Sequence, residues 1–297
     1  MSALFVRLQY LLPHHLLCRI VYALARARTV WLKNLLIDAF MRGYRPAMAD
    51  ALEPEPRHYP SFNAFFTRAL RREARPIDPD PLRLVSPCDG TLSVAGALAG
   101  SELLQAKGRA FSLGSLLADD GSWVRQLQGG AYATIYLAPF NYHRVHMPLA
   151  GRLVGAWHIP GRLFSVNSAT VDRVPGLFAR NERVVCAFAG DHGAFAVVLV
   201  GALFVGSMST VWHGEVTPWR GARAPTRGGT RGVHQLQPTG VADLHQPRGA
   251  ELGRFNMGST VLLLLPPGLA RWDAGLAPGA AVAVGQGLGS LIVPGLS

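Results

Sequence analysis

Lysine is nearly absent from this chain. Only Lys33 and Lys107 occur, and all the other basic residues are arginine or histidine. An enzyme that works through pyridoxal phosphate needs a lysine to hold that cofactor. Lys33 lies in a segment predicted to be helical, and no recognisable phosphate-binding loop accompanies Lys107. Pyridoxal-phosphate chemistry therefore stays only as an alternative.

Cysteine is also scarce. Cys18, Cys88 and Cys186 are far apart in the sequence and form no CxxC or CxxH pattern. A disulfide framework and a cysteine-rich zinc site both need a regular set of cysteines. The spacing argues against both and is typical of a protein from a reducing compartment.

Long apolar runs are missing. The apolar stretch from residue 8 to 17 contains Pro13, His14 and His15, and arginines interrupt the segment that follows. A transmembrane helix needs about 18 apolar residues in a row, and a secretory signal needs an apolar region that ends in small residues. We expect neither in this sequence.

Apolar residues, glycine and positive charge are plentiful. The 297 residues are 49% hydrophobic, include 33 glycines and 21 prolines, and have a net charge of +11. Such a chain can bury one large core or two smaller ones and makes many turns. The charge predicts an anionic partner, and by sign alone nucleic acid and an acidic membrane surface both fit.

The first 45 residues or so have helical periodicity. Apolar residues recur at helical spacing in Leu4–Leu12, Ile20–Leu24 and Val30–Phe40. Up to Arg42 this part has six basic residues and a single acid, Asp38. Helices with an apolar face and an excess of arginine suit a membrane interface, and ordinary packing against a core is an equal alternative. We assign residues 1–60 to a helical membrane-associating region.

Beyond this region the pattern becomes strand-like. Residues 46–82 are predicted to be a connector that ends in a short helix with Ser61 as its N-cap. Short apolar stretches between turn residues predict strands at Ala131–Leu137, Val184–Phe188, Phe195–Val200, Ala202–Val205 and Thr260–Leu265, and further short strands in Ala270–Ser297. Such close spacing leaves little room for crossover helices. The predicted fold class is α+β, with a mostly antiparallel β core over residues 61–297 and amphipathic helices at the N-terminus.

Residues 220–240 are predicted to form a basic loop. Arginines from Arg220 to Arg231 lie among glycine, alanine and proline. An RNA-binding segment of the RGG type would interleave aromatic residues with the arginines, and only Trp219 is near. A basic loop is therefore favoured over a nucleic-acid contact.

The first candidate site is Gly258-Ser259-Thr260. The chain has five other Gly-Ser pairs, but this one directly precedes a predicted strand. Glycine tolerates a strained backbone before a rigid strand, and such a backbone would let the oxygen of Ser259 reach the carbonyl of Gly258. A tight turn that leads into a buried strand is the plainer alternative.

The second candidate is the pair His143 and His146. Two histidines three residues apart can face one site where the backbone is helical or turned. Imidazole titrates near neutrality, so both are candidate proton carriers. With a carboxylate they would also suit a metal ion. The plainer alternative is one structural histidine and one exposed histidine.

The third candidate is Asp89, in a Pro-Cys-Asp-Gly turn. An aspartate in such a turn usually bonds to its own backbone. Asp89 becomes a candidate only if it pairs with a histidine, which a carboxylate can orient and stabilise.

Taken together and in order, segments along nearly the whole chain resemble phosphatidylserine decarboxylases of the bacterial membrane-associated type. The collinear segments are LQYLLP at 8–13, FNAFF at 62–66, RPID at 75–78, SPCDG at 86–90, QAKG at 105–108, YHRVHMP at 142–148, LFSVN at 163–167, FARNER at 178–183, GRF at 253–255 and GSTV at 258–261. Two departures are small: Met257 stands where the family usually has leucine, and Cys88 stands where alanine is common. Neither removes a chemical group that the family's reaction needs.

The resemblance implies a self-processing zymogen. Asp89 and His146 would activate Ser259, whose hydroxyl cuts the bond after Gly258 and leaves a covalent pyruvoyl cofactor derived from Ser259. The two products would be chains 1–258 and 259–297. The pyruvoyl ketone then serves as an electron sink while phosphatidylserine is decarboxylated to phosphatidylethanolamine. The resemblance gives His143 the role of the acid that returns a proton, and it implies no metal.

The resemblance also implies the partners and the location. The expected partners are phosphatidylserine, an anionic membrane surface and the two chains of one precursor; a homodimer is left open, and nucleic acid is not expected. The expected location is the cytoplasmic side of the cell membrane, as a peripheral protein. A metal- or pyridoxal-phosphate-dependent enzyme, or a basic membrane- or RNA-binding module, stays as the alternative.

Overall fold

The computed structural model describes residues 2–106, 109–119, 121–204, 207–217, 233–237 and 243–293. Lys107, Trp219 and the arginines of the predicted 220–240 loop lie outside the described residues. In the described part, helices dominate the N-terminal region and strands follow from residue 83 onward. All pairings between the strands of the described part are antiparallel. The predicted α+β class is confirmed.

The described helices are mostly short outside the N-terminal region. They are α1 (Ser2–Leu11), α2 (His14–Arg26), α3 (Val30–Tyr44), α4 (Phe62–Phe66), α5 (Leu113–Leu117), α6 (Ser122–Leu127), α7 (Ser168–Val171) and α8 (Leu177–Arg180), with 3₁₀ turns η1 (Pro56–His58) and η2 (Arg72–Ala74). The predicted cap of α4 is confirmed, because the hydroxyl of Ser61 accepts a bond from the amide of Ala64 at 3.2 Å.

The described strands form one large sheet and three smaller ones. The large sheet has the order β12 (His234–Gln235), β7 (Gly151–Ile159), β8 (Arg183–Gly190), β9 (Gly193–Gly201), β15 (Ser259–Leu265), β5 (Ala131–Leu137), β2 (Gly90–Ala97) and β17 (Ala281–Val282), with β13 (His245–Gln246) also on β7. The smaller sheets are β11 (Gly214–Val216), β10 (Met208–Thr210), β14 (Glu251–Phe255) and β6 (Arg144–His146); β1 (Arg83–Val85), β18 (Gly287–Leu291) and β16 (Ala270–Trp272); and β3 (Glu102–Ala106) with β4 (Arg109–Ser112).

One predicted strand is wrong. Strand β9 ends at Gly201, and the chain turns at Leu203 and Phe204, where Phe204 has a φ of 69°. A strand cannot continue through this left-handed conformation. Val205, the last residue of the predicted strand, lies outside the described residues.

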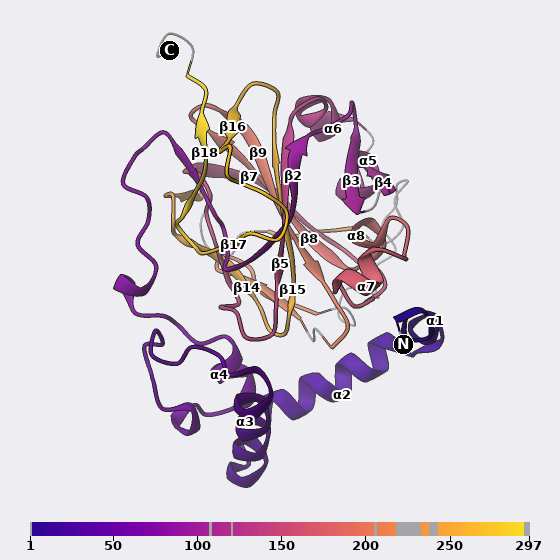
Figure 1. Cartoon of the computed structure of the whole chain (residues 1–297), viewed down its shortest axis with the longest axis vertical. Helices are drawn as coiled ribbons and strands as arrows, with labels where there is room; N and C mark the ends of the chain where they lie inside the picture. Colours follow the sequence, from indigo (N-terminus) through magenta and orange to yellow (C-terminus); the bar gives the residue numbers. More distant parts are fainter. Residues whose placement is uncertain are drawn as a thin grey trace.

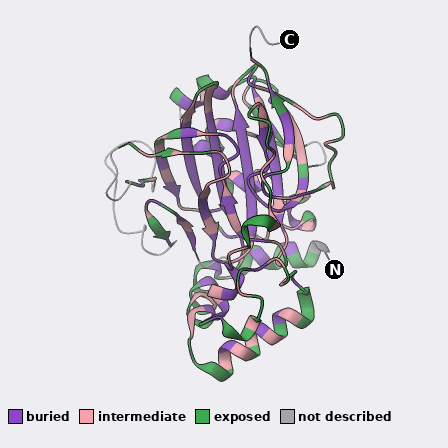
Figure 2. Ribbon diagram, turned by 90° about the vertical axis from the view of Figure 1, so that its left-hand side faces the viewer, coloured by how far each residue is buried: buried purple, intermediate pink, exposed green. Residues whose placement is uncertain are grey.

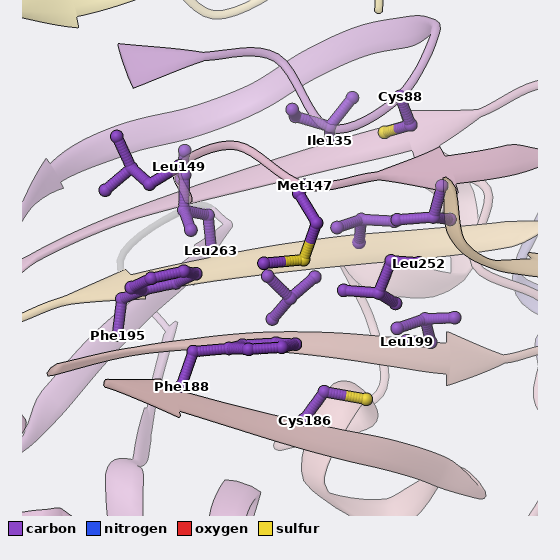
Figure 3. Packing of buried hydrophobic residues seen from close by; sticks show 14 of the residues in the cluster. Cys88, Ile135, Met147, Leu149, Cys186, Phe188, Phe195, Leu199, Leu252 and Leu263 are labelled. Atoms are coloured by element: carbon purple, nitrogen blue, oxygen red, sulfur yellow. The ribbon is translucent and has the colours of Figure 1, made fainter. Parts of the chain in front are cut away.

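Strand β15 runs through the middle of the large sheet and is buried along its whole length. It pairs with β5 on one side and with β9 on the other. Val261, Leu263 and Leu265 point into one hydrophobic core, while Leu262 and Leu264 point into the core on the opposite face. Covering on both faces explains why this strand is a continuous apolar run and not an alternating one. Figure 3 shows Leu263 in the first core near Leu149, with Met147, Leu199 and Leu252 farther along the same core.

The N-terminal helices gather at one end of the sheet, and β16 and β18 lie at the other (Figure 1). A third core joins α2, α3 and α4, and it contains Phe40, Phe62, Phe65 and Phe66. Met257 packs against both this core and the second core of the large sheet. The residue before Gly258 therefore lies where the helices meet the sheet.

Helices α1 to α3 leave many large apolar side chains exposed. Figure 2 shows exposed and buried residues alternating along them, in contrast to the buried strands. Leu11 is 82% exposed, Trp31 69% and Leu4 65%. Within the described residues, none of the helices has both the length and the apolar character needed to cross a bilayer.

The three cysteines are free and buried. Burial raises the pKa of the Cys18 thiol to about 12, and it raises those of Cys88 and Cys186 well above the usual range. The expectation that the cysteines form no disulfide is confirmed. Thiols that stay protonated at neutral pH are poor nucleophiles, so none of the three cysteines is a candidate nucleophile.

Candidate active site

Gly258 and Ser259 lie at the start of the central strand. Ser259 is the first residue of β15 and pairs with Leu137 of β5 and Gly201 of β9. Neighbours on both sides and a 1% exposed side chain fix its position in the sheet. A short turn from Phe255 to Gly258 connects this strand to β14. A reactive serine placed here would be held by the ladder of the largest sheet.

Among the residues that the structure describes, the hydroxyl of Ser259 has no hydrogen-bond partner, although its oxygen is buried. A buried hydroxyl that makes no bond costs about 1–3 kcal/mol. Proteins rarely leave such a group unpaired unless it has a role in chemistry or binding. The side chain is therefore free to act as a nucleophile or as the precursor of a bound group, and the hydroxyl of Thr260 is buried without a partner in the same way.

His143 lies directly beside Gly258. A Cβ atom built on Gly258 would be 3.9 Å from Nε2 of His143, and this nitrogen is buried without a partner. The other ring nitrogen, Nδ1, is 2.8 Å from the carbonyl oxygen of Asn141. A carbonyl oxygen can only accept, so Nδ1 bears the proton and Nε2 presents a free lone pair toward Gly258.

Burial is also the main influence on the charge of His143. The imidazole is fully buried with the ring of Phe66 at 4.0 Å between centroids. Burial, followed by the positive charge of Arg68, lowers the pKa of His143 to about 3. The ring is therefore neutral at physiological pH, and its burial makes Nε2 a weak base.

His146 points to a different place. Its Nδ1 is 2.8 Å from the carbonyl oxygen of Gly249, and its Nε2 is 3.1 Å from the hydroxyl of Tyr142. Burial lowers its pKa, opposed by the bond to Gly249 and by nearby carboxylates. His146 ends the short strand β6, and residues three apart on an extended backbone point to opposite faces. The helical or turned backbone that would bring both histidines to one site is not present.

Asp89 is held by an arginine. Nε and Nη2 of Arg75 donate to the carboxylate of Asp89 at 2.6–3.0 Å, and the amide of Val284 donates to it at 2.9 Å. The bond to Asp89 is the main cause of a raised pKa of Arg75. Asp89 influences His146 through space without a hydrogen bond between them. The sequence pointed to a histidine partner, whereas the direct partner is Arg75.

Of the predicted site residues, the structure brings Gly258, Ser259 and His143 together. It places His146 on a different cavity of about 540 Å³, which Arg75 and Tyr142 also line. Among the described residues there is no group of three or more histidine, cysteine, aspartate or glutamate side chains arranged to hold a metal ion. The predicted alternative of a metal site on both histidines and Asp89 has no such geometry in the described chain.

The lysine alternative is also unsupported by the surroundings of Lys33. Its Nζ donates to the side chain of Asn34 at 2.7 Å and to the carbonyl oxygen of Arg57 at 2.6 Å. Both bonds lie within the N-terminal region, and Lys33 is not among the residues that line the cavity at Ser259. Lys107 is outside the described residues.

A cavity of about 450 Å³ opens beside the Gly258–Ser259 bond. Its wall includes both residues of the bond, Phe66, and residues from the third N-terminal helix, Phe40 and Tyr44. The wall is mostly apolar and aromatic, with the polar groups concentrated in Ser165, Asn167 and Ser259. The cavity joins the unpartnered hydroxyl to the helices that expose apolar side chains.

The backbone at Gly258 differs from the prediction. Its φ is outside the left-handed region, and a Cβ atom there would meet no atom closer than 3.9 Å. The expectation that glycine is needed here for a strained backbone is not met. What distinguishes the position is its place between a free imidazole nitrogen and a buried, unpartnered hydroxyl.

An unpartnered hydroxyl, a neutral imidazole and an apolar cavity meet at one peptide bond, an arrangement typical of an enzyme active site. Comparisons with known proteins assign the chain to a family of enzymes. A family model described as phosphatidylserine decarboxylase matches residues 62–290, and one described as PSD matches residues 4–45. The chain belongs to the phosphatidylserine decarboxylase family.

Curated relatives match over nearly the full length. The chain is 49% identical to a phosphatidylserine decarboxylase proenzyme of Methylococcus capsulatus over 97% of this chain and 96% of that protein. It is 48% identical to that of Azotobacter vinelandii over 98% and 99%. It is 52% identical to that of Alkalilimnicola ehrlichii over 86% of each chain.

Proposed function

We propose that this chain is a precursor that cuts itself between Gly258 and Ser259 and then decarboxylates phosphatidylserine. The observation that supports this most is the meeting of two buried, unpartnered atoms, Ser259 Oγ and His143 Nε2, at one peptide bond. The word proenzyme in the names of the relatives agrees with a cut precursor. The products would be chains 1–258 and 259–297.

The cut is an internal acyl shift followed by elimination. Ser259 Oγ attacks the carbonyl carbon of Gly258, and the amide nitrogen leaves that carbon and takes up a proton, so the amide becomes an ester. Loss of the α-proton of residue 259 then breaks the Cβ–Oγ bond, which releases Gly258 as a carboxylate and leaves dehydroalanine. Addition of water and loss of ammonia give a pyruvoyl group at the start of the short chain.

The activation of Ser259 is assigned to Asp89 and His146 by the family resemblance. Two features support the assignment: the lowered pKa keeps His146 neutral and able to take a proton, and Asp89 stabilises the protonated ring through space. In the precursor, however, His146 bonds to Tyr142 and Gly249, and the Ser259 hydroxyl has no partner. The imidazole must therefore shift, or act through another group, to reach Ser259.

The residues around Ser259 fit a pyruvoyl group. Ser259 is buried, the free imidazole nitrogen of His143 lies beside the Gly258–Ser259 bond, and a cavity opens at this bond. When present, that group supplies a ketone that binds the substrate amine and accepts the electrons released with carbon dioxide. His143 supplies the proton transfers. Its bare Nε2 lies beside this position, and we assign to it the return of a proton to the α-carbon after carbon dioxide has left. Burial makes the ring a weak base in the precursor, so a negative charge on the bound substrate is needed to raise its pKa for this transfer.

The substrate reaches the site from a membrane. A diacyl lipid cannot leave a bilayer cheaply, since each CH₂ exposed to water costs about 0.8 kcal/mol. The cavity at Ser259 is lined by α3 residues Phe40 and Tyr44, and α3 also exposes Trp31 and Leu35. We therefore assign the helices of residues 1–60 to docking on an anionic membrane surface. The three free cysteines fit the reducing, cytoplasmic side.

Replacement of Ser259 tests the proposal. A Ser259→Ala variant should remain one chain, show no decarboxylase activity and still bind vesicles that contain phosphatidylserine. Thr260→Val is a matched control, because Thr260 also has a buried, unpartnered hydroxyl but points to the opposite face of β15. This control should be cut. An active and uncut Ser259→Ala protein would rule out the proposed reaction.

A further inference from the structure

Glu215 of strand β11 connects helix α2 to the sheet. Its carboxylate accepts short hydrogen bonds from the guanidinium of Arg26 and from the hydroxyl of Ser207, and it accepts a bond from the hydroxyl of Tyr22 at 3.1 Å. Tyr22 and Arg26 are one helical turn apart on α2, and the guanidinium lies 3.7 Å from the centroid of the tyrosine ring. One carboxylate thus binds both side chains that α2 offers on this side.

The same carboxylate reaches the turn before the proposed cut. Nδ2 of Asn256 lies 3.3 Å from Oε1 of Glu215 and 2.7 Å from the hydroxyl of Ser207. The backbone amide of Asn256 donates to the backbone carbonyl of Ser207 at 3.0 Å. The backbone carbonyl of Asn256 accepts a bond from the side-chain amide of Asn63 at 2.9 Å. Asn256 is only 4% exposed, and its backbone and side chain are bonded on both sides. It precedes the Gly258–Ser259 bond by two residues.

The turn is also tied to the histidine of the site. The amide of Phe255 donates to the backbone carbonyl of His143 at 3.0 Å. Since Phe255 is bonded to His143 and Asn256 to the Glu215 cluster, the turn is held in place up to two residues before Gly258. The position of the Gly258 carbonyl relative to Ser259 Oγ therefore depends on both attachments.

We propose that Glu215 is a positioning residue for the self-cleavage step, which sets the Gly258 carbonyl in place and couples it to the seating of α2. The inference rests on the proposed self-cleavage. An attacking oxygen must meet its carbonyl within a few tenths of an ångström, and a displacement of about 1 Å can cost about 10²-fold in rate. Helix α2 exposes Leu16, Ile20 and Leu24 on another side. A movement of α2 would then reach the scissile bond through Arg26, Glu215 and Asn256.

The test follows the rate of cutting in freshly synthesised protein on denaturing gels. Glu215→Ala and Arg26→Ala should each slow the cut by about tenfold or more. The double variant should be no slower than the slower single variant, because both changes break one network. Arg26→Lys, which keeps the positive charge, should recover part of the rate. Asp273→Asn, which breaks the Arg83–Asp273 pair elsewhere on the molecule, should be cut like the wild type.

Stability is measured separately in uncut proteins that also bear Ser259→Ala. The thermal midpoints of the Glu215→Ala and Asp273→Asn proteins should fall by similar amounts. Glu215→Gln replaces Glu215→Ala if the latter does not fold. A wild type that stays uncut would refute the proposed function itself. If the wild type is cut, two results would overturn the positioning role. The Glu215 and Arg26 single variants could be cut as fast as the wild type, or the rate loss of the double variant could equal the product of the two single losses.

Discussion

Nε2 of His143 faces Gly258, with a Cβ atom on that glycine placed 3.9 Å away. The nitrogen has no other partner, and neither has the hydroxyl of Ser259. Two polar atoms left unbonded in one buried place destabilise the folded chain. Their cost is understandable if both atoms act in the reaction, and this relationship leads to the predictions below.

The space at Gly258 predicts that alanine is tolerated there. Gly258→Ala should fold and be cut, with the rate reduced by less than about tenfold, because the added methyl meets only ordinary contacts. Gly253→Ala is the matched control, since its Cβ would lie 2.3 Å from the carbonyl oxygen of Ser209. The control should misfold. Gel analysis of soluble protein measures both, and a Gly258→Ala protein that folds but is never cut would contradict the account.

The different surroundings of the two histidines predict different defects. His143→Asn should still be cut but should lose decarboxylation by about 10²- to 10⁴-fold, the usual contribution of a general acid or base. His146→Asn should fail to be cut, because the proposed activator of Ser259 is gone. Exposed His192→Asn is the control and should behave like the wild type. Cutting assays and carbon dioxide release separate these outcomes, and the reverse pattern would exchange the two roles.

Burial of His143 predicts a loss of stability in acid. Burial lowers its pKa from 6.5 to about 3. Between these values the unfolded chain binds a proton that the folded chain does not, so the free energy of unfolding falls as pH falls through this window. Between pH 7 and pH 4 the free energy of unfolding should fall less in His143→Asn than in the wild type. The difference between the two losses should be up to about 3 kcal/mol. Urea unfolding of Ser259→Ala proteins measures this, and equal losses would show that His143 is protonated without penalty.

The bonds between Arg75 and Asp89 predict that the arginine supports cutting. Arg75→Ala should slow the cut by about tenfold or more, because a buried carboxylate loses its counter-charge. Guanidinium ion added to this variant should recover part of the rate. The control is Arg248→Ala, which removes an arginine that lines the same cavity and donates to the backbone carbonyls of Asp78, Asp80 and Arg83. A cut at the wild-type rate in Arg75→Ala would contradict the supporting role of this arginine.

The exposed side chains of the N-terminal helices predict where vesicles bind. Leu11→Glu and Trp31→Glu should each weaken binding to vesicles with phosphatidylserine by about tenfold, since each removes roughly 1.5–3 kcal/mol of apolar burial. Ile292→Glu places the same charge directly after β18, a strand at the opposite end of the molecule (Figure 1). Sedimentation with vesicles measures the affinities. Equal losses in all three variants would assign the effect to charge alone.

Much of the fold could be predicted because periodicity is a local property. The helical spacing before residue 45, the Ser61 cap and the apolar run of β15 each depend on neighbours in sequence. The prediction of a strand at Ala202–Val205 was wrong because Phe204 has a left-handed backbone conformation, which a phenylalanine side chain does not indicate. The order of strands in the sheets depends on long-range pairing and was not predicted.

The site was predicted less completely because it depends on side-chain directions. His143 and His146 are close in sequence, but an extended backbone sends them to opposite faces. Arg75 belongs to the RPID segment that supports the family resemblance. Its bond to Asp89 could not be predicted, because it depends on the directions of both side chains in the fold. Glu215 and Asn256 carry no local signal, since their contact joins residues 41 positions apart.

Intact mass spectrometry of the purified wild-type protein tests the central claim most directly. The account predicts two polypeptides, residues 1–258 and residues 259–297, the shorter one beginning with a pyruvoyl group in place of serine. Ser259→Ala should give one mass for all 297 residues. A decarboxylating wild-type protein with the single mass of the uncut chain would contradict the account.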